Sequence, residues 1–253
     1  DNLSNSYFTT VKNIKSITGT DVIFEENDLN DTANLFKIIE KYNISNVIHL
    51  AAKKSIHESF QNPLDYYSNN IGGLICLTKC LEKRKKKVNF IFSSSACVYS
   101  DQNQVPFNES SDISSSNPYG ISKIFGEKIL NSLNNEIFNI GILRYFNPAG
   151  SHMSGLIGQN EISNFTNLFS VINDTAFKLL EFVPIYGTDY DTKDGTCIRD
   201  YFHVMDLAEG HVSALNYLIR KNKNFTLNLG IGSGFSIKEV ISAFSEFNKI
   251  NIP

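Results

Sequence analysis

The sequence lacks the features that would place it in a membrane, on a nucleic acid or in an oxidising compartment. No apolar run is long enough to span a bilayer. The 23 basic and 26 acidic residues give a net charge of −3, which provides no strong attraction to nucleic acid or to an anionic membrane. The four cysteines form no Cys-x-x-Cys pair, and no second group of ligands completes a metal site. We therefore expect a cytoplasmic protein with no metal, and with neither a membrane nor a nucleic acid as partner.

The first residues lack the start of a nucleotide-binding sheet. The chain opens at Asp1 without an initiator methionine, and no strand with Gly-x-x-Gly-x-x-Gly precedes it. A doubly wound sheet without its central first strand should not fold well alone. We therefore expect the sequence to be part of a longer protein.

Helix and strand signals alternate along the first half of the chain. Apolar runs at 47–51, 90–92 and 140–146 predict buried strands, and helical spacing after Asp31 and Pro63 predicts covering helices. This alternation predicts an α/β fold, a Rossmann-type doubly wound parallel sheet, over residues 1–150. Further strands at 183–186 and 225–229 and helices at 206–219 and 236–247 predict, for residues 151–253, mainly a smaller substrate-binding lobe that is interleaved with the sheet.

Residues 88–123 carry the most informative pattern. An apolar strand ends in a serine triplet whose last member is Ser95, and Tyr119 and Lys123 follow at the start of a helix. A lysine four residues after a tyrosine lies on the same helix face, where its ammonium favours the phenolate. The phenol pKa is ordinarily about 10, so a cationic nicotinamide nearby would help to lower it. The pattern predicts proton transfer by Tyr119, with Ser95 relaying the proton or holding the substrate oxygen.

A second Tyr-x-x-x-Lys pattern spans Tyr217 and Lys221. No serine-tipped strand precedes it, so we interpret it as an ordinary amphipathic helix end. The glycines of Gly230-x-Gly232-x-Gly234 are interpreted in the same way, as a structural turn, because no suitable acidic residue follows them.

Four blocks of sequence, SSSACVYS, NPYGISK, LRYFNPAG and DGTCIRDYFHVMDLAEGH, resemble the extended short-chain dehydrogenase/reductases. The likeness runs from Asp1 to about Phe244 and is strongest to the branch of UDP-hexose 4-epimerases. It implies reversible C4 epimerisation of UDP-glucose and UDP-galactose through a transient 4-keto sugar, with NAD tightly bound by an NAD-binding domain of residues 1–150. It also implies a homodimer, in which the tyrosine helix and the helix from Pro63 of each subunit form a four-helix bundle. The apolar residues expected there include Leu64, Leu74, Leu77, Ile124 and Leu130.

The resemblance also implies a set of cofactor-binding residues. Asp1 would accept hydrogen bonds from the adenosine ribose and repel a 2′-phosphate, which favours NAD over NADP. Lys54 matches a phosphate-contacting lysine. Asp28 could equally cap the next turn, and Asn69 could lie on a helix surface. The full set is Asp1, Asn2, Asn5, Ser6, Asp28, Leu29, Leu50, Ala51, Ala52, Lys54, Asn69, Tyr119, Lys123 and Phe146.

The substrate-binding residues are likewise implied by the resemblance. Arg199 and Asn147 would hold the diphosphate, for which a guanidinium is well suited. A salt bridge between Arg199 and Asp200 is the alternative. The remaining positions are Ser95 beside the sugar and Asn167, Leu168 and Tyr186 at the uridine, although Tyr186 could also be a core residue of a strand.

Three other functions fit parts of the pattern. One is another UDP-sugar epimerase of the same fold. A nucleotide-sugar 4,6-dehydratase would carry an Asp-Glu pair where this chain has Ala96 and Cys97. A non-catalytic NAD-binding regulator would be expected to lose Tyr119 or Lys123, and both are present.

Overall fold

The computed structural model describes residues 1–158 and 167–253. The chain divides into two compact units, one of residues 1–145 and 206–229 and the other of residues 146–205 and 230–253. The division of roles at residue 150 stays a prediction. Within the described residues, no helix combines the length and apolar character needed to cross a membrane.

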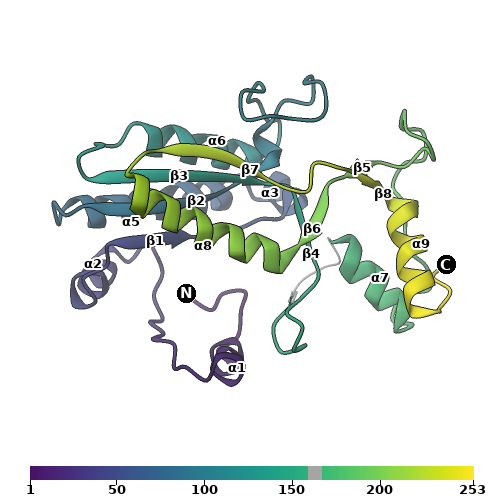
Figure 1. Ribbon diagram of the computed structural model, residues 1–253, viewed down its shortest axis with the longest axis horizontal. Helices are drawn as coiled ribbons and strands as arrows, with labels where there is room; N and C mark the ends of the chain where they lie inside the picture. The colour runs from purple at the N-terminus through teal and green to yellow at the C-terminus, as the bar shows by residue number, and fades with distance from the viewer. Residues whose placement is uncertain (159–166) are drawn as a thin grey trace. The chain divides into compact units, whose positions relative to one another are not determined.

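The first unit is built on a parallel sheet (Figure 1). Its strands are β1 (Asn46–His49), β2 (Val88–Ser95), β3 (Phe138–Tyr145) and β7 (Phe225–Leu229), in the order β1-β2-β3-β7. Strands β2 and β3 are buried over nearly their whole length, as expected for parallel strands covered on both faces. Their register sets Ser95 opposite Tyr145 and Ser94 opposite Arg144. The carboxyl end of β2 is therefore a row of buried polar groups.

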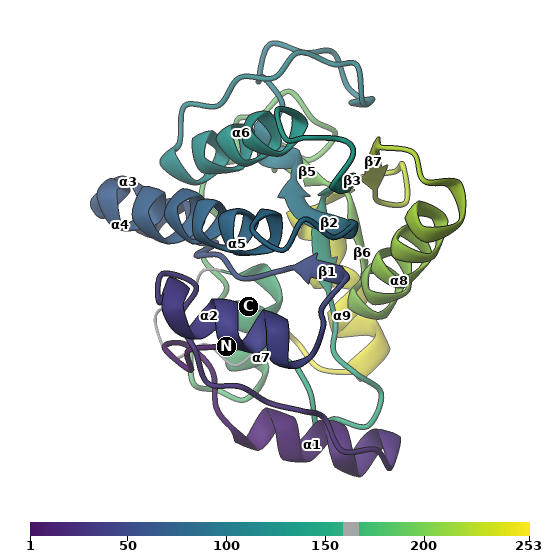
Figure 2. The ribbon, with the colours of Figure 1, turned by 90° about the vertical axis from the view of Figure 1, so that its left-hand side faces the viewer.

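Helices cover both faces of this sheet. Helices α2 (Thr32–Lys41), α5 (Gly73–Glu82) and α6 (Pro118–Asn131) lie on one face, and α8 (Val204–Lys221) lies on the other (Figure 2). Alternate residues of β2 point to opposite faces, so Phe90 packs in the cluster with α2, α5 and α6, whereas Ile91 packs against α8. The predicted Rossmann-type doubly wound sheet is confirmed.

Local sequence signals explain where several helices begin. Asp31 accepts the N–H of Asn34 and caps α2, as predicted. Helices α1 (Thr9–Thr18) and α3 (Ile56–Gln61) complete the set before Pro63. The long helix expected from Pro63 is present, as the uninterrupted run of α4 (Pro63–Tyr66), a π-helical turn over Tyr67–Gly72, and α5. Such turns add a residue to the helix and re-aim the side chains within it.

The second unit has two short sheets and two helices. Strand β4 (Asn147–Ala149) pairs in parallel with β6 (Tyr201–His203), and β5 (Ile198–Arg199) pairs antiparallel with β8 (Phe235–Ser236). Helices α7 (Leu168–Ala176) and α9 (Ile237–Asn248) pack on a core of their own. The strand predicted at 183–186 is wrong: this segment runs without a strand partner, and the Val183 N–H is bonded to the Pro253 carbonyl instead.

The glycine turn of the second unit closes on a carboxylate. The N–H groups of Ile231 and Gly232 donate to the Asp200 carboxylate at 3.1 and 2.9 Å. A Cβ on Gly230 would lie 2.6 Å from that carboxylate, so only glycine fits there. The turn is structural, as its position in the chain predicted.

Candidate active site

The end of β2 and the start of α6 bring Ser95, Tyr119 and Lys123 together in the first unit. Asn117 caps α6 by accepting the Gly120 N–H at 2.7 Å, and Pro118 fits the first helical position. Tyr119 therefore stands in the first turn, with its side chain near enough to Ser95 for Ser95 to favour the phenolate. All three side chains are buried, with residue exposures of 7, 7 and 4% for Ser95, Tyr119 and Lys123. The group is shielded from bulk water, as acid–base chemistry with hydride transfer requires.

Gly120 allows this close approach of helix and strand end. A Cβ at this position would lie 2.2 Å from the Ser115 Oγ and 2.7 Å from the Cys97 carbonyl oxygen. Neither contact is tolerable, and the second involves backbone that cannot turn away. The glycine after Tyr119 therefore fixes how near the phenol comes to the residues that follow Ser95.

Burial makes Tyr119 a weaker acid than an ordinary tyrosine. Its pKa is raised, first by burial and then by the nearby Tyr145 and Cys97, while the nearby Ser95 acts in the opposite direction. The protein alone thus keeps the phenol protonated at neutral pH. Further positive charge at the site is needed before Tyr119 can act as a base.

Lys123 holds its ammonium inside the protein. Its Nζ donates to the Ser93 carbonyl oxygen at 2.7 Å and lies 5.8 Å from the centre of the Tyr119 ring. Burial lowers the pKa of Lys123 to about 8, and Glu127 opposes this shift. The amine is therefore protonated at pH 7 but close to losing its proton above that pH.

Three residues that the sequence analysis missed are tied to this group. Glu127 and Arg144 form a buried ion pair in which Arg144 Nη2 and Glu127 Oε2 are 2.6 Å apart. On the other face of the sheet, His211 Nε2 lies 3.0 Å from the Ser93 Oγ. Glu127 is eight residues after Tyr119, so the helical spacing of Tyr119, Lys123 and Glu127 was a signal that could have indicated it.

The π-helical turn supplies a fourth missed residue, Asn70. Asn70, the neighbour of the predicted Asn69, is buried, and its Nδ2 donates to the Lys53 carbonyl and to the Ser122 Oγ, both at 3.0 Å. Its Oδ1 accepts the Lys53 N–H at 2.8 Å and the Asn69 Nδ2 at 2.9 Å. Asn70 thereby fastens the loop after β1 to the tyrosine helix. The Asn69 side chain is hydrogen-bonded to Asn70, and its contact with the cofactor stays a prediction.

The residues predicted at the adenosine end of the cofactor lie together at the start of the chain. Asp1 Oδ1 accepts the Leu3 N–H and the Ser6 hydroxyl, while no described residue donates to Oδ2. Asn2 Nδ2 donates to Asp28 Oδ2 at 2.6 Å. The pKa of Asp28 is lowered, first by the Asn30 backbone N–H and then by Asn2, so this carboxylate also organises its own turn. Asn5 is exposed in the same segment.

These residues fit NAD by the chemistry of their groups. The free oxygen of the exposed Asp1 carboxylate can accept from a ribose hydroxyl and would repel a 2′-phosphate. The loop after β1 presents small or exposed residues at the carboxyl end of the sheet, where ligands of this fold bind: Leu50, Ala51, Ala52 and Lys54. Leu29 packs against Gly73, whose added Cβ would lie 3.3 Å away. Within the described ranges, no cluster of His, Cys, Asp or Glu could hold a metal ion.

The residues predicted to hold the diphosphate lie in the second unit. Arg199 is exposed on β5, and among the residues that the structure describes its Nη1 donates to the neighbouring Ile198 carbonyl at 2.8 Å. Because the Asp200 carboxylate is bonded to the glycine turn, the alternative salt bridge between Arg199 and Asp200 is not formed. Asn147 Nδ2 donates to the Asp200 carbonyl at 3.1 Å. Phe146 is half-buried beside Gly230 in the same unit.

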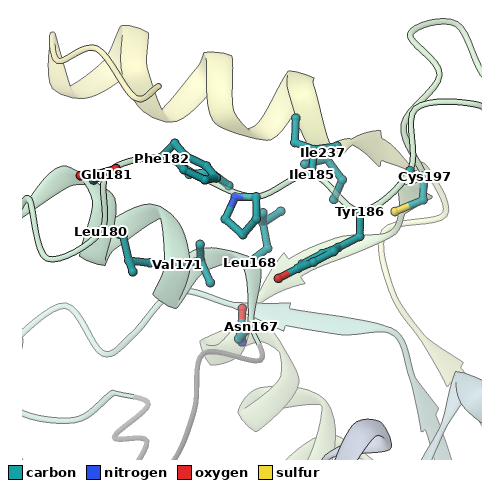
Figure 3. A pocket seen from close by; sticks show the side chains of 13 residues that line it. Asn167, Leu168, Val171, Leu180, Glu181, Phe182, Ile185, Tyr186, Cys197 and Ile237 are labelled. Carbon is teal, nitrogen blue, oxygen red and sulfur yellow. The ribbon is translucent and has the colours of Figure 1, made fainter.

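A pocket of about 690 Å³ lies within the second unit (Figure 3). Leu168 and Val171 of α7 line one side, Ile237 of α9 lines another, and the Tyr186 ring points across the opening. Tyr186 is 86% exposed, so it is not the strand core residue that was the alternative. Asn167 caps α7 by accepting the Phe169 N–H at 3.0 Å and also lines the pocket. The volume is in the range of small-molecule sites.

Comparison with known proteins assigns the class of this fold and site. Residues 4–230 match the model of the NAD dependent epimerase/dehydratase family, and the chain belongs to this family. A UDP-glucose 4-epimerase of Dictyostelium discoideum is 42% identical to it, over all of this chain and 74% of that protein.

Solved structures agree with this assignment. The UDP-glucose 4-epimerase of Stenotrophomonas maltophila, with bound NAD and formylated UDP-arabinopyranose, has a TM-score of 0.96 and 38% identity, over the whole of this chain and 76% of that one. The enzyme of Bifidobacterium longum, in complex with NAD+ and UDP, has a TM-score of 0.93 and 39% identity, with the same coverage. The resemblance to UDP-hexose 4-epimerases that was drawn from four sequence blocks is confirmed.

Proposed function

We propose that the protein is an NAD-dependent UDP-glucose 4-epimerase, which interconverts UDP-glucose and UDP-galactose. The observation that carries the proposal is the buried group of Ser95, Tyr119 and Lys123 at the carboxyl end of the parallel sheet. It stands in a chain that belongs to a family of epimerases and dehydratases. The group has a proton acceptor, a hydroxyl to hold the reacting oxygen and a buried cation, which are the parts that oxidation at C4 requires.

The residues divide the work of the reaction. Tyr119 takes the proton of the sugar 4-hydroxyl as the C4 hydride leaves, and it returns a proton when the hydride is given back to the other face. Ser95 holds the oxygen in line with Tyr119, and the Lys123 ammonium favours the phenolate. NAD, when bound, supplies the hydride acceptor and a positive charge that lowers the phenol pKa. The hexose must rotate between the two transfers, so the diphosphate has to stay bound throughout.

The test of this function is interconversion of UDP-glucose and UDP-galactose without added reductant. We expect both directions to proceed and NAD to be the nucleotide extracted from the pure protein. Accumulation of a 4-keto-6-deoxy sugar would favour the dehydratase instead, and conversion only of N-acetylated or pentose UDP-sugars would favour another epimerase. Extraction of mainly NADP would contradict the role given to Asp1.

Replacing Arg199 with alanine should weaken the binding of UDP, a ligand that has no sugar to react. A guanidinium–phosphate contact is charge-assisted, so we expect a loss of about 10-fold or more in affinity, measured by calorimetry. Lys193→Ala is the matched control, since it removes an exposed cation of the same unit that is not assigned to the substrate. Equal UDP affinity of the Arg199→Ala variant and the parent protein would reject this assignment.

We propose that the protein forms a homodimer through α3, α4 and α6. Three of the residues expected in the dimer interface, Leu74, Leu77 and Leu130, are instead part of the core of the first unit. Leu64, however, is 79% exposed on α4, and Phe60 and Phe125 are 59 and 49% exposed on α3 and α6, which pack together. Apolar side chains gathered on packed helices are typical of an interface.

Sedimentation equilibrium at micromolar concentration should give the mass of a dimer. Leu64→Glu should shift it towards the monomer, because a charge is costly in a buried apolar interface. Lys221→Glu, at an exposed position of α8 on the other face of the sheet, serves as the control for added negative charge. A parent protein that sediments only as a monomer would contradict the proposal.

We further propose that the protein acts in the cytoplasm. All four cysteines are free thiols, which suits a reducing compartment. Cell fractionation with an antibody to the protein checks this, and recovery in a secreted or membrane fraction would overturn it.

A further inference from the structure

A fully buried ion pair lies behind the group of Ser95, Tyr119 and Lys123. The side chains of Glu127 and Arg144 are each only 5% exposed. Arg144 Nε donates to Glu127 Oε1 at 2.9 Å and Nη2 donates to Oε2 at 2.6 Å, which is the two-pronged geometry of a strong guanidinium–carboxylate pair. The Ser94 hydroxyl also donates to Glu127 Oε1, at 2.5 Å. Glu127 therefore has a firmly fixed carboxylate.

This carboxylate is on the same helix face as the catalytic residues. Tyr119, Lys123 and Glu127 are four residues apart in α6, so each is a neighbour of the next along the helix. Ser94, which binds Glu127, is adjacent in β2 to Ser95, and Arg144 is opposite Ser94 in β3. The pair thus connects the tyrosine helix directly to the strand that carries the catalytic serine.

The other end of Arg144 secures the loop between β2 and α6. Its Nη1 donates to the Tyr99 hydroxyl at 3.2 Å and to the Glu109 carbonyl at 3.1 Å. The Tyr99 hydroxyl donates in turn to Asn228 Oδ1 of β7 at 2.6 Å. Packing alone does not require charges here, because a buried ion pair can often be replaced by apolar side chains without loss of stability. The charges therefore call for a reason beyond folding.

The buried ammonium of Lys123 explains why a charged pair is kept here, since few groups of opposite charge surround it. Burial pushes its pKa down and Glu127 is the group that opposes the shift. From β1, His49 faces it but is neutral, because burial lowers the pKa of His49 to about 3. The other titratable or charged groups on the packed elements are Tyr119 of α6, Tyr145 and Arg144 of β3, Tyr66 of α4, Glu58 of α3, Cys97 after β2, and His211 of α8, which contacts Ser93. Glu58 is bonded to the Tyr66 hydroxyl and paired with Lys53, whereas Glu127 is the carboxylate that acts on Lys123.

We propose that Glu127, held in place by Arg144, is a positioning residue whose negative charge keeps the buried Lys123 ammonium protonated and so supports the Tyr119 phenolate. The proposal rests on the acid–base roles given to Tyr119 and Lys123 in the proposed function. Glu127 touches neither substrate nor cofactor and acts only through Lys123. Loss of its charge, rather than loss of its shape, is the change that matters.

The experiment titrates the Tyr119 phenolate by its ultraviolet absorbance in the NAD-bound protein without substrate. Subtracting the same titration of the Tyr119→Phe form isolates this one phenol. Glu127→Gln keeps the shape but removes the charge, so Lys123 should lose its proton at lower pH and the phenolate should appear about 1 pH unit or more higher than in the parent protein. The alkaline limb of the epimerase pH profile should move to lower pH by a similar amount.

Three further variants separate charge from structure. Glu127→Asp keeps the charge and should restore the titration midpoint, even if the protein is less stable. Ser94→Ala removes a hydrogen bond of Glu127 without changing charge, so it should lower stability and leave the midpoint unchanged. Should Glu127→Gln not fold, Glu127→Gln combined with Arg144→Met removes both charges and should show a shift in the same direction.

An unchanged midpoint in the folded charge-free variants would overturn the proposal, and so would an equal shift in Ser94→Ala. Since no substrate is present, the titration is independent of which reaction is catalysed. A shifted midpoint in a protein that does not interconvert the two UDP-hexoses would reject the proposed function and keep this inference. Normal interconversion of the two UDP-hexoses with an unchanged midpoint would reject this inference and keep the proposed function.

Discussion

Tyr119→Phe is expected to reduce the interconversion of UDP-glucose and UDP-galactose by ~10²–10⁴-fold, the usual contribution of a positioned acid–base group. The substitution removes only the hydroxyl, and the buried ring keeps its place in the first turn of α6. The fold and the binding of UDP should therefore be preserved. Initial rates in both directions, together with circular dichroism and UDP affinity, measure these effects.

Tyr217→Phe is the matched control for this loss. Tyr217 begins the second Tyr-x-x-x-Lys pattern, but it is 41% exposed on α8 and packs edge-on against Phe225, with ring centres 5.4 Å apart. Removing its hydroxyl should leave turnover unchanged. Near-normal turnover by a folded Tyr119→Phe protein would end the mechanism proposed here, whatever the control shows.

The parts of the fold that were predicted correctly are those specified by local sequence. Strand β2 is a run of apolar residues buried on both faces, and its serine-tipped end is visible in the sequence itself. Asn117 and Pro118 mark the start of α6, and Ser236 marks the start of α9 through a capping box with Glu239. In each case neighbouring residues decide the structure, so the sequence is sufficient to predict it.

The features that were missed depend on contacts between distant residues. Glu127 and Arg144 are 17 residues apart, and only the register of β2 with β3 and the packing of α6 bring them together. Asn70 is a buried residue of the π-helical turn, and the sequence of that turn does not indicate that the helix changes its hydrogen-bond pattern there. The strand expected at 183–186 was wrong because its apolar residues line a pocket and a small core rather than pair in a sheet.

Lys123→Met is expected to abolish most turnover. It should also remove the free-energy cost of burying the Lys123 ammonium in the folded protein. Met fills similar apolar space but cannot favour the phenolate, so we expect the rate to fall by a factor comparable to that of Tyr119→Phe and NAD to be retained less well. The loss of the bond to the Ser93 carbonyl costs about 1 kcal/mol. Against this, a pKa of about 8 instead of 10.5 means that burying the ammonium costs roughly 3 kcal/mol at pH 7.

The pH dependence of stability distinguishes this effect from simple loss of packing. Below pH 8, Lys123 is protonated in both the folded and the unfolded protein, so the full cost applies. Between about pH 8 and 10.5 the unfolded chain binds the proton more strongly than the folded one, and the parent protein gains stability as pH rises. Lys123→Met lacks this group. Urea unfolding at a series of pH values measures the free energies of both proteins. Across this pH range, the parent protein should gain roughly 3 kcal/mol of stability relative to Lys123→Met. If the unfolding free energies of the parent protein and Lys123→Met instead change in parallel with pH, the pKa of the Lys123 amine is not lowered in the folded protein.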